Sequence, residues 1–154
     1  MNYKDLQIQL GYTFNDQSLI ELALTHKSYN NTLNNERLEF LGDSILNSII
    51  SEYLFLKFGN QKEGLLTRMR AFLVKAETLT IKAEELFLEK IIKLSKGTAN
   101  LSKERKNSIL EGAFEAVIGA IFIDGGWNAA KCTGSGLQGP DLITRLIWQW
   151  QQWV

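Results

Sequence analysis

Hydrophobic residues recur every three or four positions along most of the chain, and this spacing places them on one face of an α-helix. The longest such pattern runs from Asn35 to Phe58. A second long pattern runs from Lys103 to Ile123, and Asp124-Gly125-Gly126 predicts its end. Shorter patterns predict helices over 16–28, 65–75 and 77–86. Strand-like alternation is scarce and no segment repeats, so the sequence predicts an all-α fold.

The C-terminal segment has a different pattern. Gly134-Ser135-Gly136 predicts a flexible linker, and after Pro140 an amphipathic pattern leads into a run rich in tryptophan. We therefore divide the chain into a helical domain, residues 1–132, and an atypical Gly- and Trp-rich tail, residues 133–154. The tail is either a native amphipathic helix or a segment foreign to the natural protein.

The composition is that of a soluble globular domain, with 154 residues of which 45% are hydrophobic and 22% charged. Seventeen basic and 17 acidic residues cancel, which argues mildly against nucleic-acid binding, although local patches matter more than the total. No run of about 18 apolar residues predicts a membrane span, and the N-terminus lacks the apolar core of a signal peptide. The single cysteine, Cys132, excludes an internal disulfide and favours a cytoplasmic location.

The longest predicted helix carries a row of carboxylates. Glu36, Glu39 and Asp43 are spaced by three and four residues, so all three share one helix face. Like charges at this spacing repel each other, and a hard divalent cation such as Mg²⁺ or Mn²⁺ would relieve the repulsion. The alternative is a solvated acidic face with Lys27 and Arg37 as ion-pair partners.

A glycine within the same helix gives a second indication. Gly42 lies between the carboxylates, where glycine costs about 1 kcal/mol relative to alanine. We therefore expect another part of the chain to pack closely against the helix at this position.

The string ERLEFLGDS at residues 36–44 resembles the nine-residue signature of the ribonuclease III family. Other segments resemble the family in the same order: ALTHKS at 23–28, the stretch from Glu63 to Val74, and the stretch from Ile109 to Gly126. The resemblance covers about residues 5–132. It implies the compact all-α endonuclease-domain fold of that family, assembled as a two-fold dimer. Phe40 would be a hydrophobic plug that enters the partner subunit, and its alternative role is in the core of its own subunit.

The resemblance also implies an active site. Glu39 would be a metal ligand, Asp43 and Glu115 would be catalytic carboxylates and metal ligands, and Glu36 would lie at the edge of the site. The implied cofactor is Mg²⁺, with Mn²⁺ as a substitute. Arg68 and Arg70 are candidates for RNA contacts at the site edge. Three other basic residues at 103, 105 and 106, and Lys75, are further candidates, and solvated helix faces explain them equally well.

The sequence departs from the family at one position of the implied site. The family usually has an Asp three residues before the position of Glu115, and this chain has Gly112 there. Glu111 is four residues before Glu115 and shares roughly the same helix face, so it is a candidate replacement ligand. The alternative for Glu111 is an ordinary exposed helix charge.

The activity that the resemblance implies is metal-dependent hydrolysis of double-stranded RNA during maturation of ribosomal, transfer or messenger RNA. The products would carry 5′-phosphate and 3′-hydroxyl ends, and each subunit of a homodimer would cut one strand. Bacterial members usually add a double-stranded-RNA-binding domain, and nothing after Cys132 resembles one. Because of Gly112, a catalytically impaired RNA-binding or dimerisation module on the same fold is the second hypothesis. The third hypothesis is a structural helical protein whose acidic faces have no catalytic or binding role.

Overall fold

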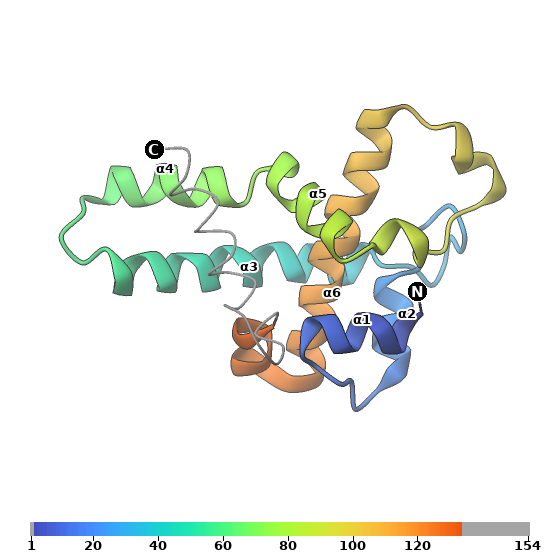
Figure 1. Ribbon diagram of the computed structural model, residues 1–154, viewed down its shortest axis with the longest axis horizontal. Coiled ribbons are helices and arrows are strands. Elements are labelled where there is room, and N and C mark those ends of the chain that lie inside the picture. The colour runs from blue at the N-terminus through green and yellow to red at the C-terminus, as the bar shows by residue number, and fades with distance from the viewer. Residues whose placement is uncertain (1, 134–154) are drawn as a thin grey trace.

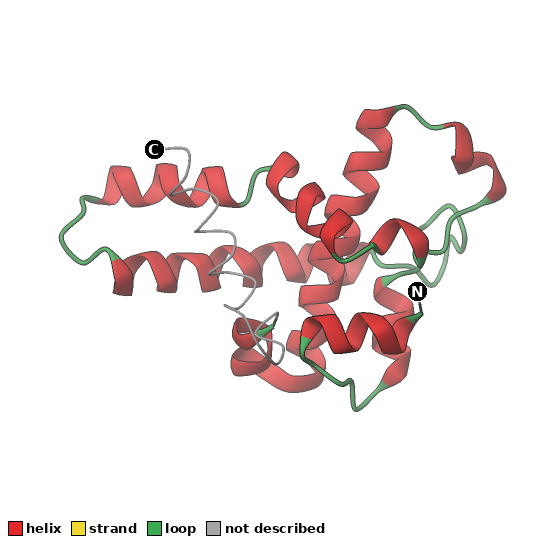
Figure 2. Ribbon diagram, viewed as in Figure 1, coloured by secondary structure: helices red, strands yellow, loops and turns green. Residues whose placement is uncertain are grey.

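The computed structural model describes residues 2–133, which form six α-helices and two short 3₁₀ helices. In chain order these are α1 (Tyr3–Leu10), α2 (Gln17–Ala23), α3 (Glu36–Lys57), α4 (Glu63–Leu73), α5 (Ala76–Glu85), η1 (Leu88–Lys90), η2 (Lys96–Asn100) and α6 (Lys103–Cys132). Within residues 2–133 there is no strand (Figure 2), only an isolated bridge between Thr25 and Lys93. The prediction of an all-α fold is therefore confirmed. The predicted tail lies outside the described residues, apart from Thr133.

The two longest helices, α3 and α6, cross at the centre of the molecule (Figure 1). Helices α2 and α5 pack on α6, and α4 returns alongside the second half of α3. The core between these helices includes Leu46 and Ile50 from α3 and Phe114 and Ile121 from α6, each at most 1% exposed. Complete burial of each such side chain contributes roughly 1.5–3 kcal/mol, so the α3–α6 crossing is a principal source of stability.

Two glycines allow the backbones of α3 and α6 to touch. A β-carbon at Gly42 would lie 1.8 Å from the carbonyl oxygen of Glu115, and one at Gly119 would lie 2.3 Å from the carbonyl oxygen of Leu38. No side chain fits in either space, because the neighbouring atoms belong to a helix backbone. The close packing predicted at Gly42 is thus confirmed, and the partner is α6.

The N-terminal helix was not among the predicted elements. Asn2 and Asp5 form a reciprocal capping box at its start, and Gly11 ends it in the left-handed conformation, with φ of 64°. Its buried face carries Leu6 and Leu10, both fully buried. Eight residues give a weak periodic signal, and the tertiary contact of these two leucines stabilises the helix.

Two predicted helix ends differ from the structure. Helix α2 ends at Ala23 rather than residue 28, because Leu24 and His26 exchange backbone hydrogen bonds with Lys93 and leave the helical path. Helix α6 does break at Gly126, which has φ of 77°, but the helical conformation then resumes and continues to Cys132. The predicted stop is therefore a kink.

Asp124, just before that kink, joins α6 to the loop between α1 and α2. Its carboxylate accepts hydrogen bonds from the Tyr12 hydroxyl at 2.7 Å and from the backbone N–H groups of Asn15 and Asp16 at 2.8 and 2.9 Å. The Asp-Gly-Gly segment thus anchors the N-terminal helices to α6.

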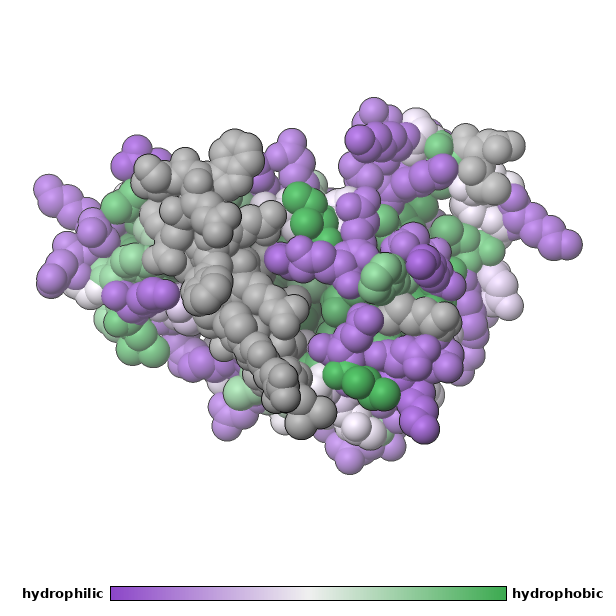
Figure 3. Space-filling view, viewed as in Figure 1, coloured by the Kyte–Doolittle hydropathy of each residue, from purple (hydrophilic) through white to green (hydrophobic). Residues whose placement is uncertain are grey.

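On the face in view, the described residues show hydrophilic side chains with separate apolar patches between them (Figure 3). None of the described helices combines the length and the apolar character needed to cross a bilayer. Among the large apolar side chains of residues 2–133, Phe40 has the largest exposed fraction, 78%. The alternative core role of Phe40 is therefore wrong within this subunit.

Candidate active site

Four carboxylates come together where α3 and α6 cross. Glu39 and Asp43 are on α3, and Glu111 and Glu115 are on α6. The charges of Asp43, Glu111 and Glu39 all act on Glu115, which shows that the four groups are neighbours. We refer to these four side chains as the acidic cluster. The structure thus brings together the metal ligands expected from the sequence, including the candidate replacement Glu111.

Glu115 is the most buried member of the acidic cluster, with 9% of the residue exposed. Burial raises its pKa to about 8, and the negative charges of Asp43, Glu111 and Glu39 add to the increase. At neutral pH this carboxyl group therefore holds its proton unless a positive charge is brought near it.

Burial also raises the pKa of Glu39 and of Glu111. The charge of Glu36 adds to the effect at Glu39, and the charge of Asp43 adds to it at Glu111. Within residues 2–133, neither these two carboxylates nor that of Glu115 has a hydrogen-bond or ion-pair partner. Glu115 is buried, whereas Glu39 and Glu111 are half-buried. A cation beside these three carboxylates would offset the cost of removing their charges from water.

Asp43 differs from the rest of the acidic cluster because it is exposed and has a partner. Asn47, one helical turn further along α3, donates a hydrogen bond from Nδ2 to Asp43 Oδ1 at 2.8 Å. This contact fixes the orientation of the Asp43 carboxylate. Asn47 was not among the site residues predicted from the sequence, although its spacing of four residues from Asp43 places it on the same helix face.

Among residues 2–133, no three His, Cys, Asp or Glu side chains are arranged to hold a metal ion as they stand. As the side chains stand, Asp43 is bonded to Asn47 and Glu39 lies against Gly112. The donor chemistry nevertheless fits a hard divalent cation, because carboxylate oxygens are the ligands that Mg²⁺ and Mn²⁺ prefer. The carboxylates of the acidic cluster are therefore the residues whose chemistry fits such a cation.

Gly112 makes a specific contact with the acidic cluster. A β-carbon at this position would lie 2.7 Å from Glu39 Oε2 and 3.1 Å from Glu39 Oε1. The carboxylate of Glu39 thus lies directly against the bare backbone of α6. Because position 112 has no side chain, the Glu39 carboxylate can occupy the place that a β-carbon would take.

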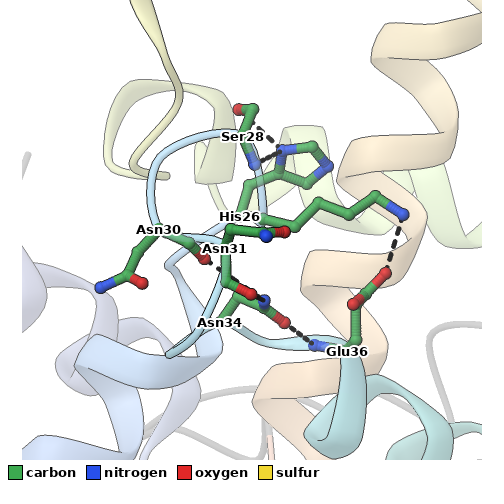
Figure 4. Close-up of polar contacts among 7 residues, drawn as sticks. His26, Ser28, Asn30, Asn31, Asn34 and Glu36 are labelled. Atoms are coloured by element: carbon green, nitrogen blue, oxygen red, sulfur yellow. Dashed lines mark hydrogen bonds and ion pairs between the residues drawn. The ribbon is translucent and has the colours of Figure 1, made fainter.

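The edge of the site is formed by the start of α3 and the loop before it (Figure 4). Lys27 Nζ donates to Glu36 Oε1 at 2.7 Å, and Asn34 Oδ1 accepts from the backbone N–H of Glu36 at 3.1 Å. Of the two ion-pair partners expected for the acidic face, Lys27 is therefore confirmed, whereas no ion pair among residues 2–133 involves Arg37. In the same loop, His26 Nδ1 accepts a hydrogen bond from the backbone N–H of Ser28 at 3.1 Å, which gives this histidine a role in loop structure.

The two arginines predicted at the site edge lie on α4. Arg68 is exposed, and Arg70 Nη1 donates to Ser51 Oγ at 2.9 Å. Ser51 is eight residues beyond Asp43 on α3, about 12 Å along the helix axis. Within one chain, therefore, Arg70 faces the second half of α3 rather than the acidic cluster.

Arg70 lines a cavity of about 560 Å³ between the second half of α3 and α4. Its apolar wall includes Leu54, Phe55 and Leu66. Phe40 lies on the same helix but nearer its start, so the cavity and the most exposed phenylalanine are two separate features of α3.

The fold and the site together define an all-α domain whose two longest helices cross at a half-buried acidic cluster. Residues 16–134 match the family model described as Ribonuclease-III-like. The chain belongs to the ribonuclease III family, as its signature string suggested.

Comparison with relatives of known sequence supports this assignment to the family. Ribonuclease 3 from Sulfurovum sp. (strain NBC37-1) is 47% identical over 84% of this chain and 58% of its own length. Ribonuclease 3 from Pseudomonas fluorescens (strain SBW25) is 52% identical over 82% of this chain and 55% of its own length. The chain therefore spans little more than half the length of these relatives.

Solved structures share the fold. The nuclease domain of ribonuclease III from Campylobacter jejuni is 41% identical, with a TM-score of 0.81 over 95% of this chain and 96% of that one. Dicer from Pichia stipitis is 29% identical, with a TM-score of 0.67 over 92% of this chain and 59% of that one.

Proposed function

We propose that this chain is the catalytic domain of a metal-dependent endoribonuclease that hydrolyses double-stranded RNA. The observation that carries the proposal is the acidic cluster, in which Glu115 is buried, has a raised pKa and lacks a hydrogen-bond partner among residues 2–133. Membership of the ribonuclease III family supports the same activity. The expected products carry 5′-phosphate and 3′-hydroxyl ends, and the expected substrates are precursors of ribosomal, transfer or messenger RNA.

The residues that would hold Mg²⁺, or Mn²⁺ in its place, are Glu39, Asp43 and Glu115, with Glu111 in place of the carboxylate missing at Gly112. A bound divalent cation supplies activation of the attacking water and neutralisation of phosphate charge. A cation held there would lower the pKa of Glu115, because its positive charge would oppose the effect of the three acidic neighbours, and the carboxyl group would then lose its proton. Asn47 holds the Asp43 carboxylate through the 2.8 Å hydrogen bond.

We also propose that two copies assemble about a two-fold axis, so that each subunit cuts one strand of the duplex. Phe40 supports this assembly, because a phenylalanine that is 78% exposed gains free energy when another protein surface covers it. The apolar cavity of about 560 Å³ between α3 and α4 of the second copy is a suitable receptor for this ring. A two-fold axis also matches the antiparallel strands of the duplex, which proteins read mainly by shape and backbone.

The decisive test is a cleavage assay on a long RNA duplex, with Mg²⁺ present and with the metal removed by EDTA. We expect cleavage only with the metal, and we expect an Asp43→Asn variant to bind the duplex without cutting it. A single-stranded RNA of the same sequence is the control for strand specificity. If the wild-type chain binds the duplex but does not cut it at any Mg²⁺ or Mn²⁺ concentration, the chain is an RNA-binding or dimerisation module and the proposed activity is wrong.

A further inference from the structure

A second cavity lies at the opposite end of α6 from the kink, between the end of α5, η2 and the first turns of α6. It has a volume of about 690 Å³, within the range of small-molecule sites. Its apolar lining comes from the segment between η1 and α6 and from α6 itself. The apolar residues are Ile92, Leu94, Leu101, Ile109 and Leu110. The cavity is separate from the acidic cluster, since none of the four clustered carboxylates lines it.

Charged side chains around this cavity are segregated by sign. Lys96, Lys103 and Lys106 line the side formed by η2 and the start of α6. Glu84 and Glu89 line the side formed by the end of α5 and η1. Among residues 2–133, no ion pair joins these lysines to these glutamates. The opposite charges therefore stay apart across an apolar opening.

Two of these lysines lie close together on α6. Lys103 and Lys106 are three residues apart in its first turns, so they share one helix face. The acidic Glu104 lies in the same first turn but does not line the cavity. An anion placed there would therefore meet two ammonium groups. The apolar lining beside it favours a hydrophobic body over water.

We propose that this cavity binds an amphiphilic anion, that is, a small molecule with an apolar body and one carboxylate, sulfonate or phosphate group. The anionic group lies beside Lys103 and Lys106, and the apolar body contacts Ile109 and Leu110. The glutamates on the opposite wall repel the anionic group and thereby set the orientation of the ligand. This inference is independent of the proposed nuclease activity.

The location of the cavity gives the ligand access to the helix of the active site. Ile109 and Leu110 line the cavity, and the next residue is Glu111, a member of the acidic cluster. A ligand in the cavity therefore contacts the turn of α6 that immediately precedes two of the four clustered carboxylates.

The test uses 1-anilinonaphthalene-8-sulfonate as the probe, with its fluorescence titrated against the full chain and its position mapped by amide chemical shifts. We expect binding of one probe per chain, with the largest shifts at residues 92–110, and competition by decanoate. Replacement of both Lys103 and Lys106 by Glu should weaken binding by roughly tenfold or more, since both charges are exposed and the fold should persist. Ile109→Trp, which fills the cavity, should also reduce binding.

Two double variants serve as matched controls. Replacement of both Glu84 and Glu89 by Gln should leave the affinity unchanged or increase it, because repulsion is removed. Replacement of both Lys57 and Lys62, two lysines outside the cavity, by Glu should leave the affinity for the probe unchanged. The proposal is overturned if reversal at 103 and 106 has no effect on binding, if the shifts map to the cavity between α3 and α4, or if a short RNA duplex displaces the probe while decanoate does not. The last outcome would assign the surface to RNA.

Discussion

Glu39 and Gly112 are in direct contact across the α3–α6 crossing, with the Glu39 carboxylate 2.7 Å from the place that a β-carbon at position 112 would take. One helix thus leaves a space and the other fills it with a charged group. The relationship makes position 112 the most informative place to alter the acidic cluster.

Gly112→Asp should lower the Mg²⁺ concentration needed for half-maximal cleavage. The substitution displaces the flexible end of Glu39 and adds a carboxylate to the acidic cluster. Gly112→Ala is the matched control, because it displaces Glu39 equally without adding an oxygen ligand. A Mg²⁺ titration of the cleavage rate checks the prediction, and equal behaviour of the Ala and Asp variants would show that displacement of Glu39, not the new carboxylate, matters.

If Glu111 already replaces the missing ligand, Glu111→Gln should strongly raise the Mg²⁺ concentration needed for half-maximal cleavage. Adding Gly112→Asp to that variant should bring this concentration back toward the wild-type value. Rescue of this kind distinguishes a ligand from an ordinary helix charge. Unchanged Mg²⁺ dependence in Glu111→Gln would remove Glu111 from the site.

Asp43→Asn and Glu115→Gln should each reduce cleavage on the order of 10²-fold or more while the fold is retained. Both substitutions keep the shape of the side chain and remove a charged oxygen ligand. Glu104→Gln, an exposed acidic residue in the first turn of α6, is the matched control and should cleave normally. Circular dichroism and thermal unfolding verify the fold, and near wild-type rates in either test variant would remove that residue from the site.

Phe40→Ser should raise the dissociation constant of the dimer by about 100-fold or more. A buried phenylalanine contributes roughly 1.5–3 kcal/mol, and a two-fold interface contains the contact twice. Light scattering across a dilution series measures the effect. Ile8→Ser, which removes an apolar side chain that is 63% exposed on α1, is the control and should leave the dimer intact.

Acid should weaken the junction between α6 and the loop before α2 through Asp124. Burial alone would raise the pKa of Asp124, but hydrogen bonds from Tyr12, Asp16 and Asn15 outweigh it and the net pKa lies below 3.8. A depressed pKa in the folded state means that the stabilisation is present above pH 3.8 and is lost as the pH falls through the folded-state value.

Urea unfolding between pH 2.5 and pH 6 tests this effect. The free energy of unfolding of the wild type should fall toward acid more steeply than that of Asp124→Asn. At neutral pH, Tyr12→Phe should cost about 1.5–3 kcal/mol, the range for a hydrogen bond to a charged group. Parallel pH profiles of the wild type and Asp124→Asn would contradict the assignment.

A chain that ends at Thr133 should keep its helical content, its dimer and its cleavage activity. Thr133 is retained because it is only 2% exposed and its hydroxyl donates to the carbonyl of Ala129 at 2.8 Å. All the core residues described above precede Thr133 in the chain. Loss of the fold or of the dimer on truncation would make the tail an integral part of the domain, contrary to the predicted boundary.

The elements that the sequence predicted well are those with strong local signals. The pattern from Asn35 to Phe58 corresponds to α3, at Glu36–Lys57, because its 22 residues repeat the apolar spacing several times. The carboxylates of α3 could likewise be placed on one face, since that depends only on helical periodicity. Gly42 predicted a close contact because glycine destabilises a helix, and a closely packed neighbour explains its presence there.

The features that the sequence did not predict depend on distant partners. The end of α2 at Ala23 follows from hydrogen bonds to Lys93, about 70 residues away in the chain. The contact of Glu39 with Gly112 and the burial of Glu115 require the crossing of two helices whose angle and register no local pattern specifies. The resemblance to the family predicted that carboxylates of these two helices form one site. The distances and the burial within that site come from the structure.

The backbone contact between Gly42 and Glu115 also bears on how this site tolerates sequence change. Main-chain atoms, rather than side chains, set the spacing between α3 and α6 at that point. Leucine, isoleucine and phenylalanine elsewhere in the core can therefore be exchanged during divergence without altering the separation of the carboxylates on the two helices. Substitution of Gly42 itself has no such freedom, because even one methyl group would force the helices apart and open the site.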